Sequence, residues 1–412
     1  MSWKIIRLGD YITTLTDYHA NGAYSKLKAN VTLKYEPDYA IMIRTLNFER
    51  NNFQNDLIYL NENEYNFLSK SKVYEGDIIM NKIANAGSVY YMPRLHKKTS
   101  LAMNLFLIRF GELNQKFMYY LMKINEPYIK TFANGTTTKS ITKDAVRNLR
   151  FSIPQQKTQK RIADILSAYD DLIENNLKRI KLLEQAAQNI YKEWFVNMRF
   201  LGHENTPIDQ ETGLPEGWKE CLLNEYIDFK EGPGLRNWQY RTEGIPFLNI
   251  RMMKSGDLNF SSVNFLEINE VEKKYNHFLL KEYDHIISTS GTLGKVVTIR
   301  KSHLPLCLNT SIIRLRPIRD EVGKWYIKRK VSCSNFLNEM KSFATGSAQL
   351  NFGPKHLNMM KIIVPSKFIG LEFEKLTNPI ELKILSLLDY NQKLQKARDI
   401  LLPRLMNQTI VV

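Results

Sequence analysis

Residues 159–197 read QKRIADILSAYDDLIENNLKRIKLLEQAAQNIYKEWFVN, with apolar side chains recurring at alternating steps of four and three residues. A heptad pattern sustained over more than four heptads is typical of a long coiled-coil helix. At 1.5 Å per residue, this helix would be roughly 55–60 Å long. The seam positions are Ile162, Leu166, Tyr169, Ile173, Asn176, Ile180, Leu183, Ala187, Ile190 and Trp194.

A second seam of the same kind occupies the C-terminal stretch of the chain. Its positions are Ile380, Ile384, Leu387, Asn391, Leu394, Arg398, Leu401 and Leu405. We expect Pro379 in the first turn of this helix, where its missing N–H costs little, and we expect Pro403 to fray or bend the last turn. Two similar seams predict that the helices pair. An approximate two-fold relation would make the pair antiparallel with a globular domain at each end, and a tandem, solenoid-like arrangement is the alternative.

Two further features of the seams have two interpretations each. Asn176 and Asn391 would specify register if they are buried, because an unmatched amide is left unsatisfied; alternatively, both lie at a solvated margin. The bulky cluster Tyr191, Trp194 and Phe195 is either an anchor for a partner, since buried aromatics dominate interfaces, or a site of packing within the chain itself.

The segments outside the helices repeat. The matched pairs are Trp3-Lys4 with Trp218-Lys219, 75–79 and Gly87 with 282–286 and Gly294, Asn104 and Ile108-Arg109 with Asn309 and Ile313-Arg314, 132–135 with 343–346, and Pro154 with Pro365. Each half begins with ~150 residues of short alternating apolar runs, which indicate β-strands and turns. The sequence thus predicts an α+β fold of two pseudo-symmetric halves: domains at 1–155 and 201–368, and coiled-coil helices at 156–200 and 369–412.

Composition narrows the class of partner. The chain has 412 residues, 43% of them hydrophobic and 24% charged, which is an ordinary globular mix. Its 58 Lys and Arg against 42 Asp and Glu give a net charge of +16. This excess favours a polyanion such as nucleic acid, the alternative being a basic protein with no such role. The apolar runs are too short to span a bilayer, and no signal peptide or cysteine framework is evident, so we expect a soluble, cytoplasmic protein.

Catalytic signals are absent from the sequence. The seven histidines show no metal-ligand spacing. The Asn/Asp-Pro-Pro-aromatic tetrapeptide that amino-methyltransferases use does not occur, and there is no glycine-rich strand-turn-helix for a methyl-donor cofactor. The loop 290–295 lacks the glycine spacing of a phosphate-binding loop. We therefore expect no metal and no cofactor bound by this chain.

Several blocks along the chain are shared with a known family. They are 344–351 running to Val364-Pro365, its counterpart 133–141 running to 153–156, and the blocks 180–184, 232–236, 290–296 and 401–407. On these blocks the chain resembles the specificity subunit of type I restriction-modification systems. In two places the halves differ: 19–24 stands where the second half has Gly-Pro-Gly, and Ala86-Gly87 matches Gly291-Thr292 only loosely.

The resemblance implies that each domain is a target-recognition domain that reads one half of a bipartite DNA sequence. The helices would space the domains and dock two methyltransferase subunits, which bring S-adenosylmethionine and methylate adenine N6. An endonuclease subunit that uses ATP and Mg²⁺ could join the complex. This chain would perform no chemistry itself. The alternatives are a self-contained nuclease or methyltransferase with an unrecognised site, and a protein-interaction scaffold without a DNA role.

Candidate DNA-binding residues are polar or basic side chains near glycines or at strand ends, because such groups read base edges and hold phosphates. They are Arg44, Asn47, Lys82, Asn85, Thr136, Thr137, Thr138, Lys139, Ser140, Arg236, Asn237, Trp238, Tyr240, Asn249, Arg251, Thr289, Ser290, Thr292, Lys295, Ser347, Gln349 and Asn351.

Overall fold

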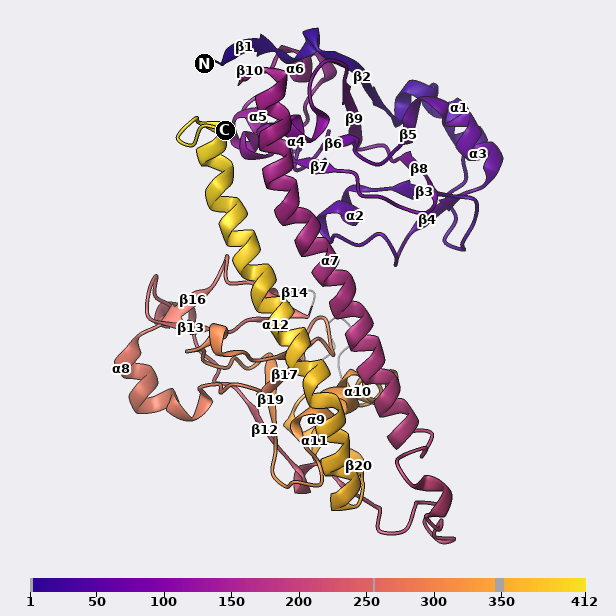
Figure 1. The fold of residues 1–412 in the computed structure, drawn as a ribbon, viewed down its shortest axis with the longest axis vertical. Coiled ribbons are helices and arrows are strands. Elements are labelled where there is room, and N and C mark those ends of the chain that lie inside the picture. Colours follow the sequence, from indigo (N-terminus) through magenta and orange to yellow (C-terminus); the bar gives the residue numbers. More distant parts are fainter. Residues whose placement is uncertain (1–2, 255, 345–351) are drawn as a thin grey trace. The chain divides into compact units, whose positions relative to one another are not determined.

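The computed structural model describes residues 3–254, 256–344 and 352–412. It divides into two compact units. Unit 1 comprises Met1–Ile173 with Leu394–Val412, and unit 2 comprises Glu174–Lys393. Two long helices, α7 (Gln156–Phe195) and α12 (Lys367–Met406), each contribute residues to both units. Figure 1 draws each of them as one unbroken helix, α7 in magenta and α12 in yellow.

Unit 1 is built on two four-stranded sheets, ordered β2-β9-β6-β7 and β4-β3-β8-β5, with a separate β1-β10 pair. The strands are β1 (Lys4–Arg7), β2 (Ile12–Asp17), β3 (Ala40–Ile43), β4 (Ile58–Leu60), β5 (Lys72–Val73), β6 (Ile78–Asn81), β7 (Val89–Tyr91), β8 (Lys98–Leu101), β9 (Leu105–Phe110) and β10 (Arg150–Ile153). The shorter helices are α1 (Tyr24–Asn30), α2 (Thr45–Glu49), α3 (Glu62–Phe67), α4 (Gln115–Ile124), α5 (Glu126–Lys130) and α6 (Lys143–Asn148).

Unit 2 has one four-stranded sheet, ordered β12-β19-β17-β18, and three two-stranded pairs, β11-β20, β13-β16 and β14-β15. The strands are β11 (Lys219–Leu222), β12 (Ile227–Glu231), β13 (Ile245–Phe247), β14 (Met253–Lys254), β15 (Asp257–Leu258), β16 (Asn264–Leu266), β17 (His285–Ser288), β18 (Val296–Thr298), β19 (Ile312–Pro317) and β20 (Lys361–Val364). The shorter helices are α8 (Ile268–Glu270), α9 (Lys324–Ser332), α10 (Ser334–Phe343) and α11 (Pro354–Leu357).

The strand orders confirm the predicted repeat. In each unit the first strand pairs with the last one before the long helix, and the second strand opens a four-stranded sheet of equivalent order. Backbone hydrogen bonds repeat as well: Leu8 N donates to Leu149 O at 2.8 Å, and Leu223 N donates to Met360 O at 2.9 Å. The units differ in the segment between β2 and β6 and in its counterpart between β12 and β17.

One part of the predicted alignment is wrong by two residues. Arg109 forms an ion pair with Asp77, and the equivalent Asp284 pairs with Arg316. Arg314, the predicted counterpart of Arg109, instead pairs with Asp228 on the neighbouring strand β12. The same shift makes Ser311, rather than Asn309, the counterpart of Asn104. The strand pairing decides this register, because an alternating strand matches itself equally well after a two-residue slip.

The two long helices run antiparallel in each unit. In unit 2, Asn176 Nδ2 donates to Asn391 Oδ1 at 2.8 Å. Further along α7, the Trp194 ring lies against Phe373, which is equally far back along α12. In unit 1, Asp170 pairs with Arg398, and Ile162, which lies earlier on α7, shares a buried cluster with Leu405, which lies later on α12. The apolar positions of both predicted seams are buried or half-buried, which together with these contacts confirms the coiled-coil prediction.

The start of α12 differs from the prediction, because Pro379 lies well inside the helix rather than in its first turn. The helix begins at Lys367 after Ser366, whose Oγ accepts a hydrogen bond from Ile369 N. In an unbroken helix, the N–H at position 379 would donate to the Lys375 carbonyl, but proline has no N–H. Both residues are exposed, so water can hydrogen-bond to that carbonyl instead. At the other end α12 continues to Met406, so the last turn does not fray at Pro403.

The buried asparagine pair leads to a stability prediction. Replacing Asn391 by Leu leaves the Asn176 amide without its acceptor, and we expect this to lower the free energy of unfolding by about 1–3 kcal/mol. The double variant N176L/N391L replaces both partners and should recover most of that loss or exceed the wild type. Urea unfolding of the three proteins measures the difference. Equal losses in the single and double variants would show that the amide pair is not what the seam requires.

Candidate nucleic-acid interface

Two loops of unit 1 that the sequence singled out lie side by side at the end of β6, an interior strand of the β2-β9-β6-β7 sheet. The loop after β6 begins at Lys82, and the second loop spans residues 133–142. Ile141 N donates to Lys82 O at 3.0 Å, and Ala84 N donates to Lys139 O at 3.0 Å. Most of the side chains at these loop tips are exposed, including Asn85 and 136–139. Their arrangement presents hydroxyl, amide and ammonium groups together on one surface.

The second loop depends on Gly135, whose φ is +124°. A Cβ atom at this position would lie 2.4 Å from the Thr138 carbonyl oxygen. The loop closes through a bridge between Asn134 and Ser140, with both backbone hydrogen bonds at 2.8–2.9 Å. Residues 136–139 therefore form a tight, outward-facing turn that requires glycine at its start.

A buried carboxylate connects the two loops through ion pairs with two lysines. Asp17, at the end of β2, binds Lys82 Nζ at 2.9 Å through Oδ2 and Lys143 Nζ at 3.1 Å through Oδ1. Its side chain is 6% exposed, whereas those of Lys82 and Lys143 are 25% and 32% exposed. Burial alone would raise the pKa of Asp17, but the two ammonium groups outweigh it and lower the pKa below its usual value. The carboxylate is therefore charged at neutral pH.

Unit 2 places the equivalent loop after β17 in the same way. Phe352 N donates to Thr289 O at 2.9 Å, as Ile141 N does to Lys82 O in unit 1. Gly294 N donates to Ser288 O, which matches the bond from Gly87 N to Asn81 O. The Ser288 hydroxyl donates to Thr292 O at 2.6 Å and closes the loop internally. Thr292 is exposed at its tip.

The segment 232–241 of unit 2 adds an aromatic group to a basic surface. Trp238 is 74% exposed, and both Arg236 and Asn237 beside it are exposed. Arg241 Nη1 donates to the Trp238 carbonyl at 2.9 Å and holds this turn. Gly232 lies so close to the backbone of Leu308 that a Cβ atom would come within 2.3 Å of its carbonyl oxygen. A large exposed aromatic ring next to cations is suited to stacking on a base.

The remaining candidates vary in their exposure. Asn47 and Thr289 are buried; Asn47 is held by Arg44 N and Asn52 O, so its amide has a structural role. Ser140, Tyr240, Asn249, Ser290 and Lys295 are half-buried, as is Arg44, whose guanidinium donates to the Asp56 carbonyl, and Arg251 is exposed. Ser347, Gln349 and Asn351 lie outside the described residues.

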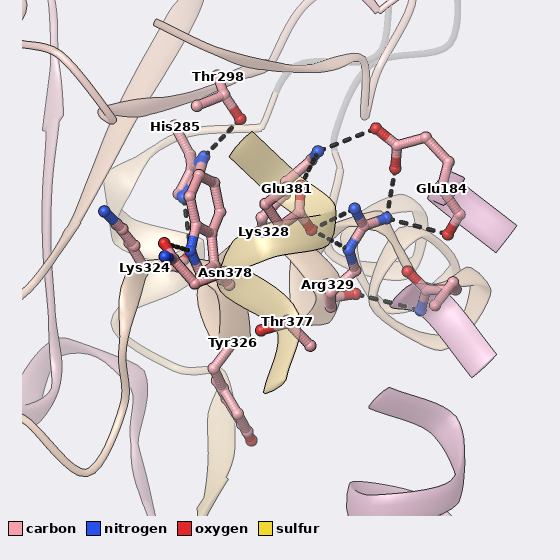
Figure 2. A network of polar contacts seen from close by, with 12 residues as sticks. Glu184, His285, Thr298, Lys324, Tyr326, Lys328, Arg329, Thr377, Asn378 and Glu381 are labelled. Atoms are coloured by element: carbon pink, nitrogen blue, oxygen red, sulfur yellow. Dashed lines mark hydrogen bonds and ion pairs between the residues drawn. The ribbon is translucent and has the colours of Figure 1, made fainter. Parts of the chain in front are cut away.

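A buried ionic network, the anchor network, attaches α9 to both long helices within unit 2 (Figure 2). Lys328 Nζ donates to Glu184 on α7 at 2.9 Å and to Glu381 on α12 at 2.6 Å. Arg329 also pairs with both carboxylates, its Nε lying 2.6 Å from Glu381. Glu381 is fully buried, and Arg329 is 1% exposed. Burial alone would raise the pKa of Glu184, but the neighbouring Lys328 and Arg329 outweigh this effect and lower the pKa below its usual value.

Unit 1 attaches its corresponding helix, α4, with different chemistry. The Tyr120 hydroxyl donates to Asp170 Oδ2 at 2.5 Å, and Arg398 Nη1 donates to Asp170 Oδ1 at 2.5 Å. In each unit, therefore, a carboxylate on the long helix that follows the domain in sequence accepts hydrogen bonds from that domain. A charged side chain on the other long helix completes the ionic network.

The aromatic cluster at the end of α7 packs within unit 2. Tyr191 and Phe195 are each 3% exposed, and both contact the rings of Tyr326 and Phe373. Trp194 is half-buried beside Phe373. Internal packing is therefore the role of this cluster, and its interpretation as a partner anchor is wrong.

Comparison with known families decides the identity of the repeat. The model of the "Type I restriction modification DNA specificity domain" matches residues 2–185 and again 215–402, so each half of the chain carries one match. The chain belongs to this family. Its two copies of the specificity domain correspond to the two repeated halves.

Similar proteins are named as specificity subunits. The chain is 23% identical over 397 residues to the type I restriction enzyme MjaVIII specificity subunit of Methanocaldococcus jannaschii, covering 92% of this chain and 87% of that protein. It is 25% identical to the HindI specificity subunit of Haemophilus influenzae, covering 83% and 88%. The fold is similar to that of the type I restriction-modification S subunit from M. genitalium, with a TM-score of 0.55, 19% identity and coverage of 98% and 96%.

Family membership makes the chain a DNA-specificity subunit and not an independent enzyme. Within the part of the chain that the structure describes, no group of three or more His, Cys, Asp or Glu side chains is arranged to hold a metal ion. In the same described residues, no helix combines the length and the apolar character needed to cross a bilayer.

Sequence reasoning missed two residues of the specificity subunit that the structure brings into the candidate interface, Asp17 and Lys143. Asp17 is the last residue of β2, and Lys143 is the first residue of α6, two residues beyond Ile141, so neither lies within the loops that the sequence singled out. A signal was present for Lys143, because a lysine at the first position of a helix is unfavourable for the helix dipole and needs a compensating anion.

His285 of the specificity subunit lies in the core beside the anchor network and does no chemistry there. Its Nε2 lies 2.7 Å from the Lys324 carbonyl and its Nδ1 lies 3.0 Å from the Thr298 hydroxyl, so Nε2 carries the proton and Nδ1 accepts (Figure 2). Complete burial, reinforced by the charge of Lys328, lowers the pKa of His285 to about 3. The ring is neutral in the folded protein.

This shift predicts an acid sensitivity of unit 2. Between the unfolded pKa near 6.5 and the folded value, only the unfolded chain binds the proton at His285, so stability falls as the pH falls. From pH 6.5 to pH 5 the loss from this residue is about 2 kcal/mol. We expect the variant H285Q to have a flatter profile. Glu374, whose pKa burial raises to about 7, acts in the opposite direction in both proteins and cancels in the comparison. Parallel profiles in urea unfolding from pH 7 to 5 would contradict the assignment.

Proposed function

We propose that this specificity subunit reads a bipartite DNA sequence, with one half-site contacted by each unit through the paired loops. One observation carries the proposal: both units present a loop after the third strand of the equivalent sheet, backed by an equivalent hydrogen bond, Ile141 N to Lys82 O and Phe352 N to Thr289 O. Two copies of one reading surface on a single chain fit a target that has two separate parts.

The exposed members of the loops are the proposed contacts. In unit 1 these are Asn85 and 136–139, with Lys82 behind them; in unit 2 they are 236–238 and Thr292. Asn and Arg side chains make bidentate contacts with base edges, whereas Lys and hydroxyl groups hold phosphates. The net charge of +16 supports the same surface, since phosphate neutralisation releases counterions.

The long helices would dock two methyltransferase subunits and keep the domains at a set spacing. Their outer faces expose large apolar side chains, which are uncommon on a helix that faces only water and which favour a protein partner. These are Leu172, Leu177 and Leu182 on α7, and Phe368, Leu371, Leu376, Leu382, Tyr390 and Ile400 on α12. The methyltransferase would bring S-adenosylmethionine, and an endonuclease subunit with ATP and Mg²⁺ could join that complex.

Methylome sequencing tests the proposal. A host that lacks other methyltransferases expresses this chain with its neighbouring methyltransferase, and single-molecule sequencing maps the modified adenines. The expected result is a single motif of two short defined blocks separated by unspecified bases. A continuous motif, or methylation that does not depend on this chain, would overturn the proposal.

Two biochemical controls address the alternatives. Purified chain alone, given DNA with Mg²⁺ or with S-adenosylmethionine, should neither cleave nor methylate, whereas a self-contained enzyme would turn over. DNA affinity should fall steeply as salt rises, because phosphate contacts require counterion release. A salt-independent affinity would instead favour a scaffold without a DNA role.

The exposed ring of Trp238 gives a prediction within unit 2. Because base–aromatic stacking contributes about 1–3 kcal/mol, the variant W238A should bind cognate DNA roughly 5- to 150-fold more weakly. Its unfolding free energy should change little, since the ring is 74% exposed. Fluorescence anisotropy measures the affinity, and I268A, which truncates another exposed apolar side chain of unit 2, serves as the control. Equal affinities for W238A and the wild type would remove Trp238 from the interface.

A further inference from the structure

The two units carry an acid at the same place in the sheet but surround it differently. In unit 1, Asp17 pairs with Phe106 across β2 and β9, and Phe106 pairs with Met80 on β6. In unit 2, Glu231 pairs with Ile313, which pairs with Ile287 on β17. The repeat equates Lys82 with Thr289, and Met80 and Ile287 each lie two residues before these positions. Asp17 and Glu231 are therefore counterparts.

The cations beside the acid occur in unit 1 and not at the matching positions of unit 2. Thr289 takes the place of Lys82. Lys143 is the first residue of α6, and the first residue of α11, two positions after Phe352, is Pro354. The pKa values follow this difference: the two lysines lower that of Asp17, whereas burial raises that of Glu231. Among the described residues, Glu231 has no ion-pair partner within 4 Å.

The geometry of unit 1 has a direct electrostatic consequence. Each lysine ammonium has three N–H donors and directs one of them at Asp17. The other donors stay free on side chains that are 25% exposed for Lys82 and 32% exposed for Lys143. The carboxylate also cancels one of the two positive charges, so the set carries a net charge of +1. Two free lysines would attract any phosphate backbone, whereas two lysines held by one buried acid keep fixed positions and attract it less.

We propose that Asp17 is a positioning residue that determines sequence specificity in unit 1, because it holds Lys82 and Lys143 at set positions toward DNA and limits their attraction to non-cognate DNA. The inference rests on the proposed function and deepens it for one half-site. Unit 2 achieves its selectivity without this clamp, so the effect of losing Asp17 is confined to the half-site that unit 1 reads.

The test uses the full chain with its methyltransferase partner. Asp17→Asn removes the charge with little change in shape, and we expect one more phosphate contact with a random-sequence duplex. That contact would steepen the slope of log K against log salt by about 0.9 and raise non-specific affinity about eightfold at 0.1 M salt. In the methylome, one block of the motif should become degenerate while the other keeps its sequence.

Matched variants separate this effect from simple charge and from folding. Asp38→Asn removes an equal charge from the solvated Lys34–Asp38 pair of the same unit and should leave the motif intact. Asp17→Glu keeps the charge, is the residue that unit 2 carries in this register, and should restore most of the discrimination. If Asp17→Asn fails to fold and yields no methylation, the variant Lys143→Gln tests the proposal instead, because its amide can still donate to Asp17. Its slope of log K against log salt should be shallower than that of the wild type by about 0.9.

The outcomes distinguish the two proposals. A wild-type motif without two blocks would overturn the proposed function. A two-block wild-type motif that Asp17→Asn leaves unchanged, or relaxes in both blocks, would overturn the clamp alone. An unchanged salt slope for Lys143→Gln would overturn it as well.

Discussion

Exchanging residues 1–155 for the corresponding domain of a relative is expected to change one block of the methylated sequence and leave the other unaltered. The expectation follows from the construction of unit 1, whose sheets, β1-β10 pair and candidate loops all lie before α7. The exchange therefore transfers a complete reading surface and leaves unit 2 untouched. Methylome sequencing of the hybrid measures both blocks at once.

The junction must preserve the attachment of α4 to α7. Tyr120 reaches Asp170 beyond the junction, and Arg398 holds the same carboxylate from α12. A donor domain with tyrosine at this position should give an active hybrid, whereas one with an acidic residue should not, because two carboxylates would then meet. Restoring tyrosine in the inactive hybrid is the matched control. A change in both blocks, or in neither, would contradict the modular assignment and the boundary at 155.

The largest loss of stability is expected from Glu381→Gln in the anchor network. Glu381 accepts from Lys328 and from two nitrogens of Arg329. Glutamine is the same size, but it loses the charge and turns an NH₂ donor toward these donors. With Glu184 as the only remaining acid, one buried cation is left unpaired. Breaking a buried pair in this way typically costs about 3–5 kcal/mol.

Calorimetry or urea unfolding measures this loss, and the surface of the same unit offers a control. Glu220 pairs with Lys361 at 2.6 Å, but both side chains are at least half exposed. Because solvent screens exposed pairs, Glu220→Gln should cost less than about 1 kcal/mol. Similar losses for the two variants would show that the network is not desolvated as its burial indicates.

The long helices and the duplication were predictable because both are periodic over many residues. The seam positions from Ile162 to Trp194 all lie on the same face of one helix, so an error at one position does not change the prediction of the helix. The repeat was visible for a similar reason: glycines and prolines at loop ends, such as Gly87 and Gly294, keep their places between two copies.

Registers and helix starts were less predictable. The run Ile313-Arg314-Leu315-Arg316 presents the same apolar-basic alternation twice, and only the partner Asp284 selects Arg316. Pro379 suggested a helix start, yet the stabilising seam extends before it and outweighs the loss of one backbone hydrogen bond. In both cases tertiary contacts decided between local alternatives of similar free energy.

The polar sets were beyond sequence reasoning. Glu184, Arg329 and Glu381 come from three distant segments, and each charge by itself is typical of a solvated surface. The Asp17 clamp likewise joins residues 65 and 126 positions apart. Charge pairs of this kind have no period, so apart from the helix-start position of Lys143, a single sequence gives no signal that distinguishes them from surface ions.

The membership of α12 in both units has a consequence for damage to the chain. Residues 394–412 belong to unit 1, where Leu405 is 1% exposed in the core and Arg398 holds Asp170. A premature stop codon or a proteolytic cut near residue 393 would therefore spare the domain next to it in sequence. It would instead destabilise unit 1, although most of that unit is translated first. The core of unit 1 is complete only when the last turns of α12 have been added.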